Sequence, residues 1–264
     1  MIVAFTSVHG APGVTTQTLL NAAAWPADLG TDRVVLEADP DGGVLGARYE
    51  LGVDPGVVSL VSATRRVDGP LAVDEHGRCV APGLWVVPGP ENAEQATAVW
   101  SAGAETVAAR CAIDEHVWLV DCGRVRAHLA SVAFFRHAAQ IVVVSGCRRE
   151  DIVPLPAAVD RLAALSRSGA AGVAAVFVGR LDYRPHEMAE FLGADVLGVV
   201  AADDDALTLA ASAAAGGRGR RSLLWRSALE TAAELAHRSI GHATLAGVEL
   251  PSGLRPTVTE GRGG

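Results

Sequence analysis

The sequence predicts an α/β domain with a doubly wound, mostly parallel sheet of about seven strands and helices on both faces. Short runs of β-branched and apolar residues recur along the chain, and longer stretches with helical patterning separate them. Most of the runs are continuously apolar, which is typical of parallel strands buried on both faces. Half of the 264 residues are apolar and only 20% are charged, which excludes a disordered chain.

Each expected strand is one of these short apolar runs. The seven runs are Ile2–Val8, Arg33–Ala38, Leu84–Pro88, His116–Asp121, Gln140–Ser145, Gly172–Val178 and Asp195–Ala201. The expected helices are Thr15–Ala27, Pro90–Cys111, Val125–His137, Asp151–Ser168, Pro185–Leu192, Asp203–Ala215 and Ser222–Ile240. Because ligands of such a sheet bind beyond the carboxyl ends of its strands, the residues that follow each strand are the candidates for function.

The chain is expected to form a single domain over residues 1–245, followed by a flexible tail over residues 246–264. No internal repeat or long linker divides the sequence, and its length suits one large domain. From about Leu250 onward Pro, Gly, Ser and Thr dominate, which is typical of a flexible terminus.

The charged residues restrict the possible chemistry. The net charge is −8, so bulk charge gives no strong nucleic-acid signal. All 22 basic residues are arginine, so a step that ordinarily uses lysine must use another group or be absent.

The four cysteines show neither a CxxC pair nor the spacing of metal ligands, and we expect ordinary buried thiols. They are Cys79, Cys111, Cys122 and Cys147.

The first strand leads into a helix through a glycine-rich turn. A turn of this kind directs backbone N–H groups and a helix dipole at an anion, so it is a candidate phosphate-binding loop. The candidate residues are Gly10, Ala11, Pro12, Gly13, Val14, Thr15 and Thr16. The Thr15 hydroxyl would suit a magnesium ion. Taken alone, the loop fits an ordinary strand–turn–helix connection equally well.

Three later segments support the interpretation of this loop as a phosphate-binding loop. Arg33–Gly43 contains Glu-Ala-Asp-Pro-Asp, His116–Gly123 ends in Val-Asp-Cys-Gly, and Val176–Arg180 ends in Gly-Arg. In order and position they resemble the ParA/MinD branch of P-loop NTPases, and the resemblance covers roughly residues 1–240. It implies that Asp39 helps to position an attacking water and that Asp121 holds magnesium through water. It also implies that Arg180 lies where the family reads adenine.

The loop departs from the family pattern, which resembles KGGxGK[ST]. His9 and Val14 occupy the positions of the two lysines, of which the first reaches across a dimer and the second holds phosphates. Gly179 replaces the adenine-reading Asn, and Glu37 replaces the first acid of a paired-Asp motif. Losing one charge-assisted phosphate contact costs about 1.5–3 kcal/mol. Hydrolysis should suffer more than binding, because the charge matters most in the transition state.

Arginines are the candidate replacements for the missing lysines. Arg124, Arg148 and Arg149 follow strands and are expected near the carboxyl edge of the sheet. The alternative is that they are solvated loop residues. Likewise, Asp39 and Asp121 are interpreted as inherited site residues, although an Asp after a strand is also a common turn residue.

Three functions are consistent with the sequence. The first is a pseudo-ATPase that acts as a localisation or assembly scaffold through protein partners, with weak or no binding of ATP, ADP and magnesium. The alternative is an active Mg-ATP-dependent ATPase in which arginine replaces lysine and which serves positioning at a cell pole, of pili or secretion machines, or of chromosomes or plasmids. A DNA-binding segregation factor is the third, supported only by the cluster Arg218–Arg221.

The resemblance also implies a bacterial cytoplasmic protein, recruited to a pole or a membrane-associated machine, that can form a homodimer. With His9 in place of the first lysine, a dimer should depend less on nucleotide. The basic, aromatic start of the last helix would suit peripheral membrane contact, but a core helix over the sheet is the preferred interpretation.

Overall fold

A computed structural model describes residues 1–9, 13–52, 54–66, 71–125, 129–165 and 172–245, together with residues 247, 250, 251 and 254. The predicted tail lies almost wholly outside this part of the chain, so the boundary at residue 245 stays a prediction.

The sheet has eight strands, of which seven match the expected runs. Its strands are β1 Ile2–Ser7, β2 Arg33–Glu37, β3 Arg78–Ala81, β4 Leu84–Val87, β5 Val117–Arg124, β6 Gln140–Gly146, β7 Gly172–Val178 and β8 Asp195–Val200. Their order is β3-β4-β2-β5-β1-β6-β7-β8. Every neighbouring pair is parallel except β3 and β4. The predicted fold class is therefore confirmed, with one additional antiparallel edge strand.

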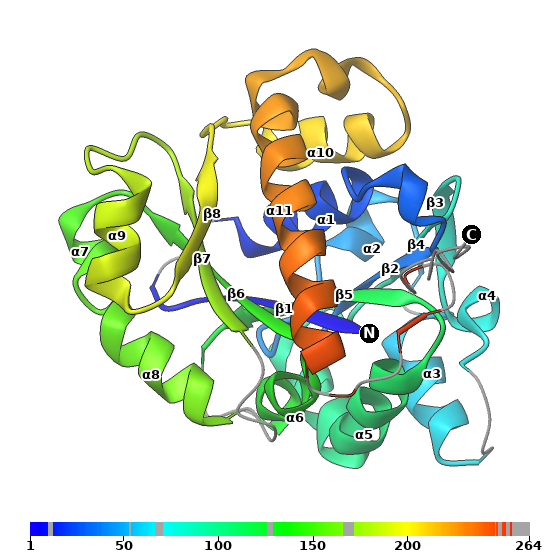
Figure 1. Ribbon diagram of the computed structural model, residues 1–264. Helices are drawn as coiled ribbons and strands as arrows, with labels where there is room; N and C mark the ends of the chain where they lie inside the picture. Colours follow the sequence, from blue (N-terminus) through cyan, green and yellow to red (C-terminus); the bar gives the residue numbers. More distant parts are fainter. Residues whose placement is uncertain are drawn as a thin grey trace, which may run out of the picture.

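Helices cover both faces of this sheet (Figure 1). The α-helices are α1 Val14–Ala23, α2 Leu45–Arg48, α3 Val57–Thr64, α4 Val73–His76, α5 Ala93–Ile113, α6 Leu129–His137, α7 Arg149–Ile152, α8 Leu155–Leu165, α9 Pro185–Leu192, α10 Ala206–Ala214 and α11 Leu223–Leu245. One core packs α1, α10 and α11 against the sheet, and the other packs α3, α5, α6, α8 and α9. The helix expected over residues 151–168 is divided into α7 and α8, because Pro154 and Pro156 lack the N–H groups of a continuous helix.

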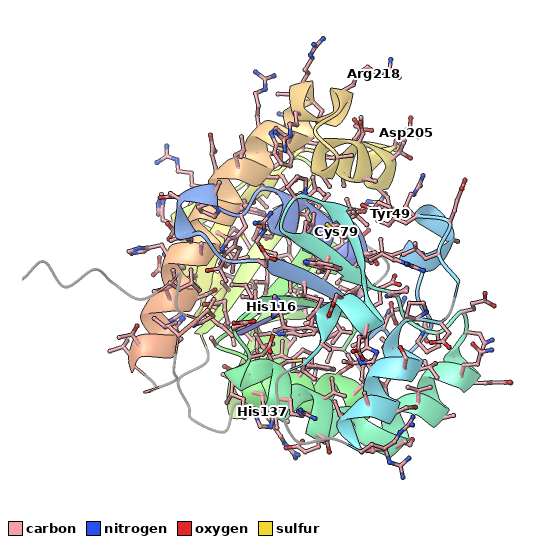
Figure 2. All side chains as sticks on the ribbon, turned by 90° about the vertical axis from the view of Figure 1, so that its right-hand side faces the viewer. Tyr49, Cys79, His116, His137, Asp205 and Arg218 are labelled. Carbon is pink, nitrogen blue, oxygen red and sulfur yellow. The ribbon has the colours of Figure 1, made fainter. Side chains whose placement is uncertain are left out.

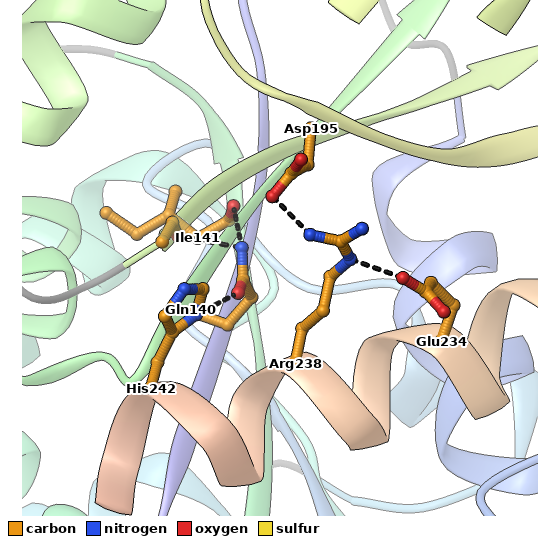
Figure 3. A network of polar contacts seen from close by, with 7 residues as sticks. Gln140, Ile141, Asp195, Glu234, Arg238 and His242 are labelled. Carbon is orange, nitrogen blue, oxygen red and sulfur yellow. Dashed lines mark hydrogen bonds and ion pairs between the residues drawn. The ribbon is translucent and has the colours of Figure 1, made fainter. Parts of the chain in front are cut away.

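The long helix α11 is fixed to the sheet by polar contacts at its C-terminal half (Figure 3). His242 Nδ1 lies 2.8 Å from Gln140 Oε1, and Gln140 Nε2 donates to the Gly172 carbonyl at 2.7 Å. Arg238 pairs with Glu234 at 2.5 Å and also with Asp195. These contacts and the buried side chains of α11 confirm the expected core helix.

The basic turn before α11 is partly used for packing. Arg220 Nε donates to the Ala213 carbonyl at 3.0 Å, and its guanidinium carbon lies 5.5 Å from the centre of the Trp225 ring. Arg218 is exposed at the outer end of the molecule, next to α10 (Figure 2). Within the described residues, no helix combines the length and the apolar character needed to span a bilayer.

The cysteines follow the expectation only in part. Cys111 and Cys122 are buried, and Cys147 is partly buried. The expectation is wrong for Cys79, which is exposed on the edge strand β3 (Figure 2). An edge strand has one unpaired side, and the first two residues of β3, Arg78 and Cys79, are both exposed, so a buried position is not required for this cysteine.

Candidate functional site

The predicted phosphate loop connects β1 to α1, and its second half can be described. Gly13 is the N-cap of α1 and has φ 87° and ψ 42°, a left-handed conformation that suits glycine. Val14, which the sequence resemblance aligns with a lysine of the family pattern, is only 6% exposed and belongs to the same core as Phe5 and Leu19. Thr16 is also buried. The predicted site residues Gly10, Ala11 and Pro12 lie outside the described residues.

Thr15 and Asp121, the predicted magnesium pair, are in direct contact. Thr15 Oγ1 donates to Asp121 Oδ2 at 2.5 Å, and the Gly123 N–H donates to Asp121 Oδ1 at 2.9 Å. Burial, with a smaller contribution from the nearby carboxylates of Asp39 and Glu37, raises the pKa of Asp121 to about 7, although the hydrogen bonds from Thr15 and Gly123 oppose that rise. The fold thus brings a hydroxyl and a carboxylate together across a sequence separation of 106 residues.

The hydroxyl of Thr15 and the carboxylate of Asp121 are the types of ligand that a magnesium ion prefers. Mg²⁺ prefers oxygen ligands and keeps several waters, so one hydroxyl and one carboxylate are a plausible protein share. No group of three or more His, Cys, Asp or Glu side chains within the described part of the chain is arranged to hold a metal ion. A magnesium ion at Thr15 and Asp121 would therefore take most of its ligands from water or a phosphate.

Asp39, the predicted catalytic acid, lies next to this pair. Its Oδ1 accepts the N–H of Asp41 at 2.8 Å, as in an Asx turn. A Cβ on Gly123 would collide with the Asp39 carboxylate, so this carboxylate lies directly against the backbone after Asp121. Gly123 has φ +59°, a conformation that also favours glycine. Asp39, two residues beyond β2, and Asp121, in the second half of β5, are therefore neighbouring acids.

Glu37 has a role that the sequence analysis missed. Its buried carboxylate accepts three backbone N–H groups, from Val44 at 2.7 Å, Leu45 at 2.9 Å and Gly89 at 3.0 Å. These bonds join the start of α2 to the segment after β4. Burial raises the pKa of Glu37, although the three N–H groups oppose that rise. Its contacts make Glu37 an anchor of the loops around the site.

A cleft of about 750 Å³ opens at the carboxyl ends of β6 and β7. His9, which follows β1, lines it together with the arginines Arg148, Arg149 and Arg180. Arg180 is thus at the predicted sheet edge, where its exposed guanidinium pairs with Asp182 at 3.7 Å. Arg124, the third candidate replacement for lysine, ends β5 beside Ser7 and is not among the residues that line the cleft.

The chain was compared with known proteins. No family model and no curated protein sequence matches it. Among solved structures, it is similar to a ParA family ATPase from Chlorobium tepidum, with a TM-score of 0.69, 16% identity and coverage of 89% of this chain and 98% of that one. The same four values describe its similarity to the cell division ATPase MinD from Pyrococcus furiosus.

A third similar structure is the septum site-determining protein MinD from Pyrococcus horikoshii, complexed with Mg-ADP. Its TM-score is 0.66 and its identity 14%, with coverage of 89% of this chain and 95% of that one. Likeness at such low identity establishes the architecture and leaves the activity open. This chain has the fold of the ParA and MinD ATPases.

Proposed function

We propose that the chain is a degenerate relative of the ParA and MinD ATPases, a pseudo-ATPase that serves as a localisation or assembly scaffold through protein partners. The observation that carries this proposal is the burial of Val14, whose side chain is only 6% exposed at the position where the family holds phosphates with a lysine. The position is therefore used for packing.

Charge supports the same reading. From Gly10 to Gln17 the sequence contains no charged residue. The loss of one charge-assisted phosphate contact lowers affinity roughly tenfold to several-hundredfold. A loop without any cation should lose more in the transition state, where the charge on the phosphate is greatest. Nucleotide binding is therefore weak or absent, and hydrolysis is absent.

A hydrolysis assay tests this proposal. The purified chain, incubated with ATP and magnesium, should release no phosphate above a buffer blank. The Asp39→Asn variant should behave identically, because no water is being activated. Magnesium-dependent turnover that falls in Asp39→Asn would overturn the proposal, since it would assign catalysis to this chain and to that carboxylate.

The alternative is an active Mg-ATPase in which arginine replaces lysine. The contact between Thr15 and Asp121 favours it, as do Arg148 and Arg149 in the cleft. If it holds, the double variant Arg148→Ala/Arg149→Ala should weaken ATP binding by about tenfold or more. The matched control Arg161→Ala, on the exposed side of α8, should leave ATP binding unchanged.

The proposal extends to the domain bounds, the cellular location and the oligomeric state of the protein. In this proposal the scaffold is a single domain over residues 1–245. We further propose that it acts in the bacterial cytoplasm, at a pole or a membrane-associated machine, and that any homodimer depends less on nucleotide than the family's dimer does.

A further inference from the structure

An apolar groove lies next to the arginine-lined cleft. Ile152, the last residue of α7, and Val153, which follows it, line one side of the groove. Met188 and Phe191 of α9 line the other side, with the carboxylate of Glu187 at its edge, around a volume of about 430 Å³. Figure 1 shows α7 and α9 beside each other at one end of the sheet. Val153 is 59% exposed and Phe191 is 50% exposed. Large apolar side chains that gather at the surface mark interaction sites more often than isolated ones do.

The groove and the cleft form one continuous surface. Arg149 and Tyr183 line both, and the Tyr183 ring is 58% exposed. An apolar trough thus runs directly into a cationic cleft. We call this combined area the α7–α9 surface.

The cleft half of the α7–α9 surface is cationic on a protein whose net charge is −8. The basic side chains that line it are His9, Arg148, Arg149 and Arg180, and the acidic ones are Asp151 and Asp182. The Asp151 carboxylate already accepts a hydrogen bond from the Arg148 N–H at 3.3 Å. The three guanidinium groups of the cleft therefore outnumber its two carboxylates.

These guanidinium groups can exchange their present carboxylate partners for those of a ligand. Arg148 is 81% exposed in its side chain and contacts Glu150 at 4.0 Å, while the Arg180 side chain is 94% exposed. Exposed ion pairs of this kind contribute little to stability, so an incoming carboxylate can replace them at small cost.

We propose that the α7–α9 surface binds an acidic peptide segment of a protein partner. A bulky apolar side chain of that segment occupies the groove between Val153 and Phe191. Its carboxylates lie against Arg148, Arg149 and Arg180, as charge complementarity requires. An apolar anchor with a charged rim is a common arrangement at protein interfaces. The inference rests on the proposed scaffold function and names the kind of partner that the scaffold would recruit.

Two other occupants fit less well. A second copy docked with this cleft on the two-fold axis would bring the same arginines of both copies together, and like charges would oppose the contact. A nucleic acid would satisfy the arginines, but its phosphates would leave the apolar groove uncovered.

The test is selection from a display library of short random peptides against the full-length chain. Enriched peptides should combine a Phe, Leu, Trp or Met with two or more acidic residues. Their synthetic versions, followed by fluorescence anisotropy, should bind about tenfold more weakly to Phe191→Ser and to Arg148→Glu/Arg149→Glu. The matched controls Leu229→Ser, exposed on α11, and Arg161→Glu, exposed on α8, should change the dissociation constant by less than about twofold. Circular dichroism establishes that each variant is folded.

Several outcomes would overturn the inference. They are the absence of enrichment, enrichment of basic peptides, and affinities that neither surface variant changes. Self-association that Phe191→Ser abolishes would assign the surface to a second copy instead. The proposed function fails separately: tight ATP binding by the unmodified chain would overturn it whatever the peptides do, whereas failed selection without ATP binding would remove only the peptide inference.

Discussion

Asp121 is the residue whose surroundings make the clearest prediction at the residue scale. Its carboxyl has a pKa of about 7 in the folded protein because it is buried, whereas an unfolded aspartate titrates near 4. The folded state therefore holds the proton more tightly between these values, and the free energy of unfolding falls as pH rises from about 4 to about 7. The slope approaches about 1.4 kcal/mol per pH unit for one proton.

Asp121→Asn should remove this pH dependence. An amide can accept the Gly123 N–H and donate to the Thr15 hydroxyl, so both contacts can persist without a titrating group. Urea unfolding at pH 5 and pH 8 should show a smaller difference in the variant, which should exceed the wild type in stability at pH 8. The control is Asp160→Asn on the exposed side of α8. An unchanged difference in Asp121→Asn would mean that Asp121 is not the responsible group.

Val14 makes the second prediction at this scale. Because its side chain is buried in the core, Val14→Lys should lower the free energy of unfolding by about 1–3 kcal/mol. A cation at a helix N-terminus is also unfavourable. Val14→Met, which stays apolar, should cost less than about 1.5 kcal/mol. Urea denaturation measures both variants. A Val14→Lys protein as stable as the wild type would show that the position tolerates a charge.

The sequence predicted some of these contacts and could not predict others. Asp39, Asp121 and Thr15 follow or begin elements with clear patterns, so their meeting at one sheet edge was predictable. The three bonds of Glu37 were not, because they need the backbone of residues 44, 45 and 89 to converge on one carboxylate. The core position of Val14 depends on how the loop enters α1, which no local pattern specifies.

At the scale of elements, the packing of α11 on β7 can be tested with a pair of glycines. A Cβ at Gly172 would collide with the His242 ring, and one at Gly241 on α11 meets nothing within 4 Å. Gly172→Ala should therefore lower the free energy of unfolding by about 1–3 kcal/mol through overpacking. Gly241→Ala should raise it by about 0.5–1 kcal/mol, because alanine favours the helix. Urea denaturation measures the free energy of unfolding of both variants, and equal effects would contradict the close contact between Gly172 and the His242 ring.

The elements themselves were predictable to different degrees. The seven expected strands are largely apolar runs, and each was expected within three residues of its observed ends. The four-residue strand β3 carries exposed arginine and cysteine, so nothing in its composition marks it. The short helices α2, α3 and α4 lie between β2 and β4, where the sequence analysis predicted no element. Their positions depend on contacts with the rest of the fold, such as those of Glu37.

At the scale of the whole molecule, self-association should not respond to nucleotide. The resemblance of the first loop to the ParA/MinD pattern implies that His9 stands where the family has a lysine that reaches the partner's nucleotide. Size-exclusion chromatography with light scattering should therefore give the same mass with and without ATP and magnesium. A dimer that forms only with ATP would contradict this expectation. His9→Ala should not alter the mass in either condition.

The scaffold account depends most on whether this fold binds nucleotide at all. Isothermal titration calorimetry of the folded chain with ATP and with ADP, in the presence of magnesium, measures that directly. The account predicts no detectable heat at millimolar nucleotide, because Val14 is part of the core and no cation takes its place in the loop. Binding with micromolar affinity would contradict the account, and Arg148 and Arg149 would then be the candidate phosphate ligands.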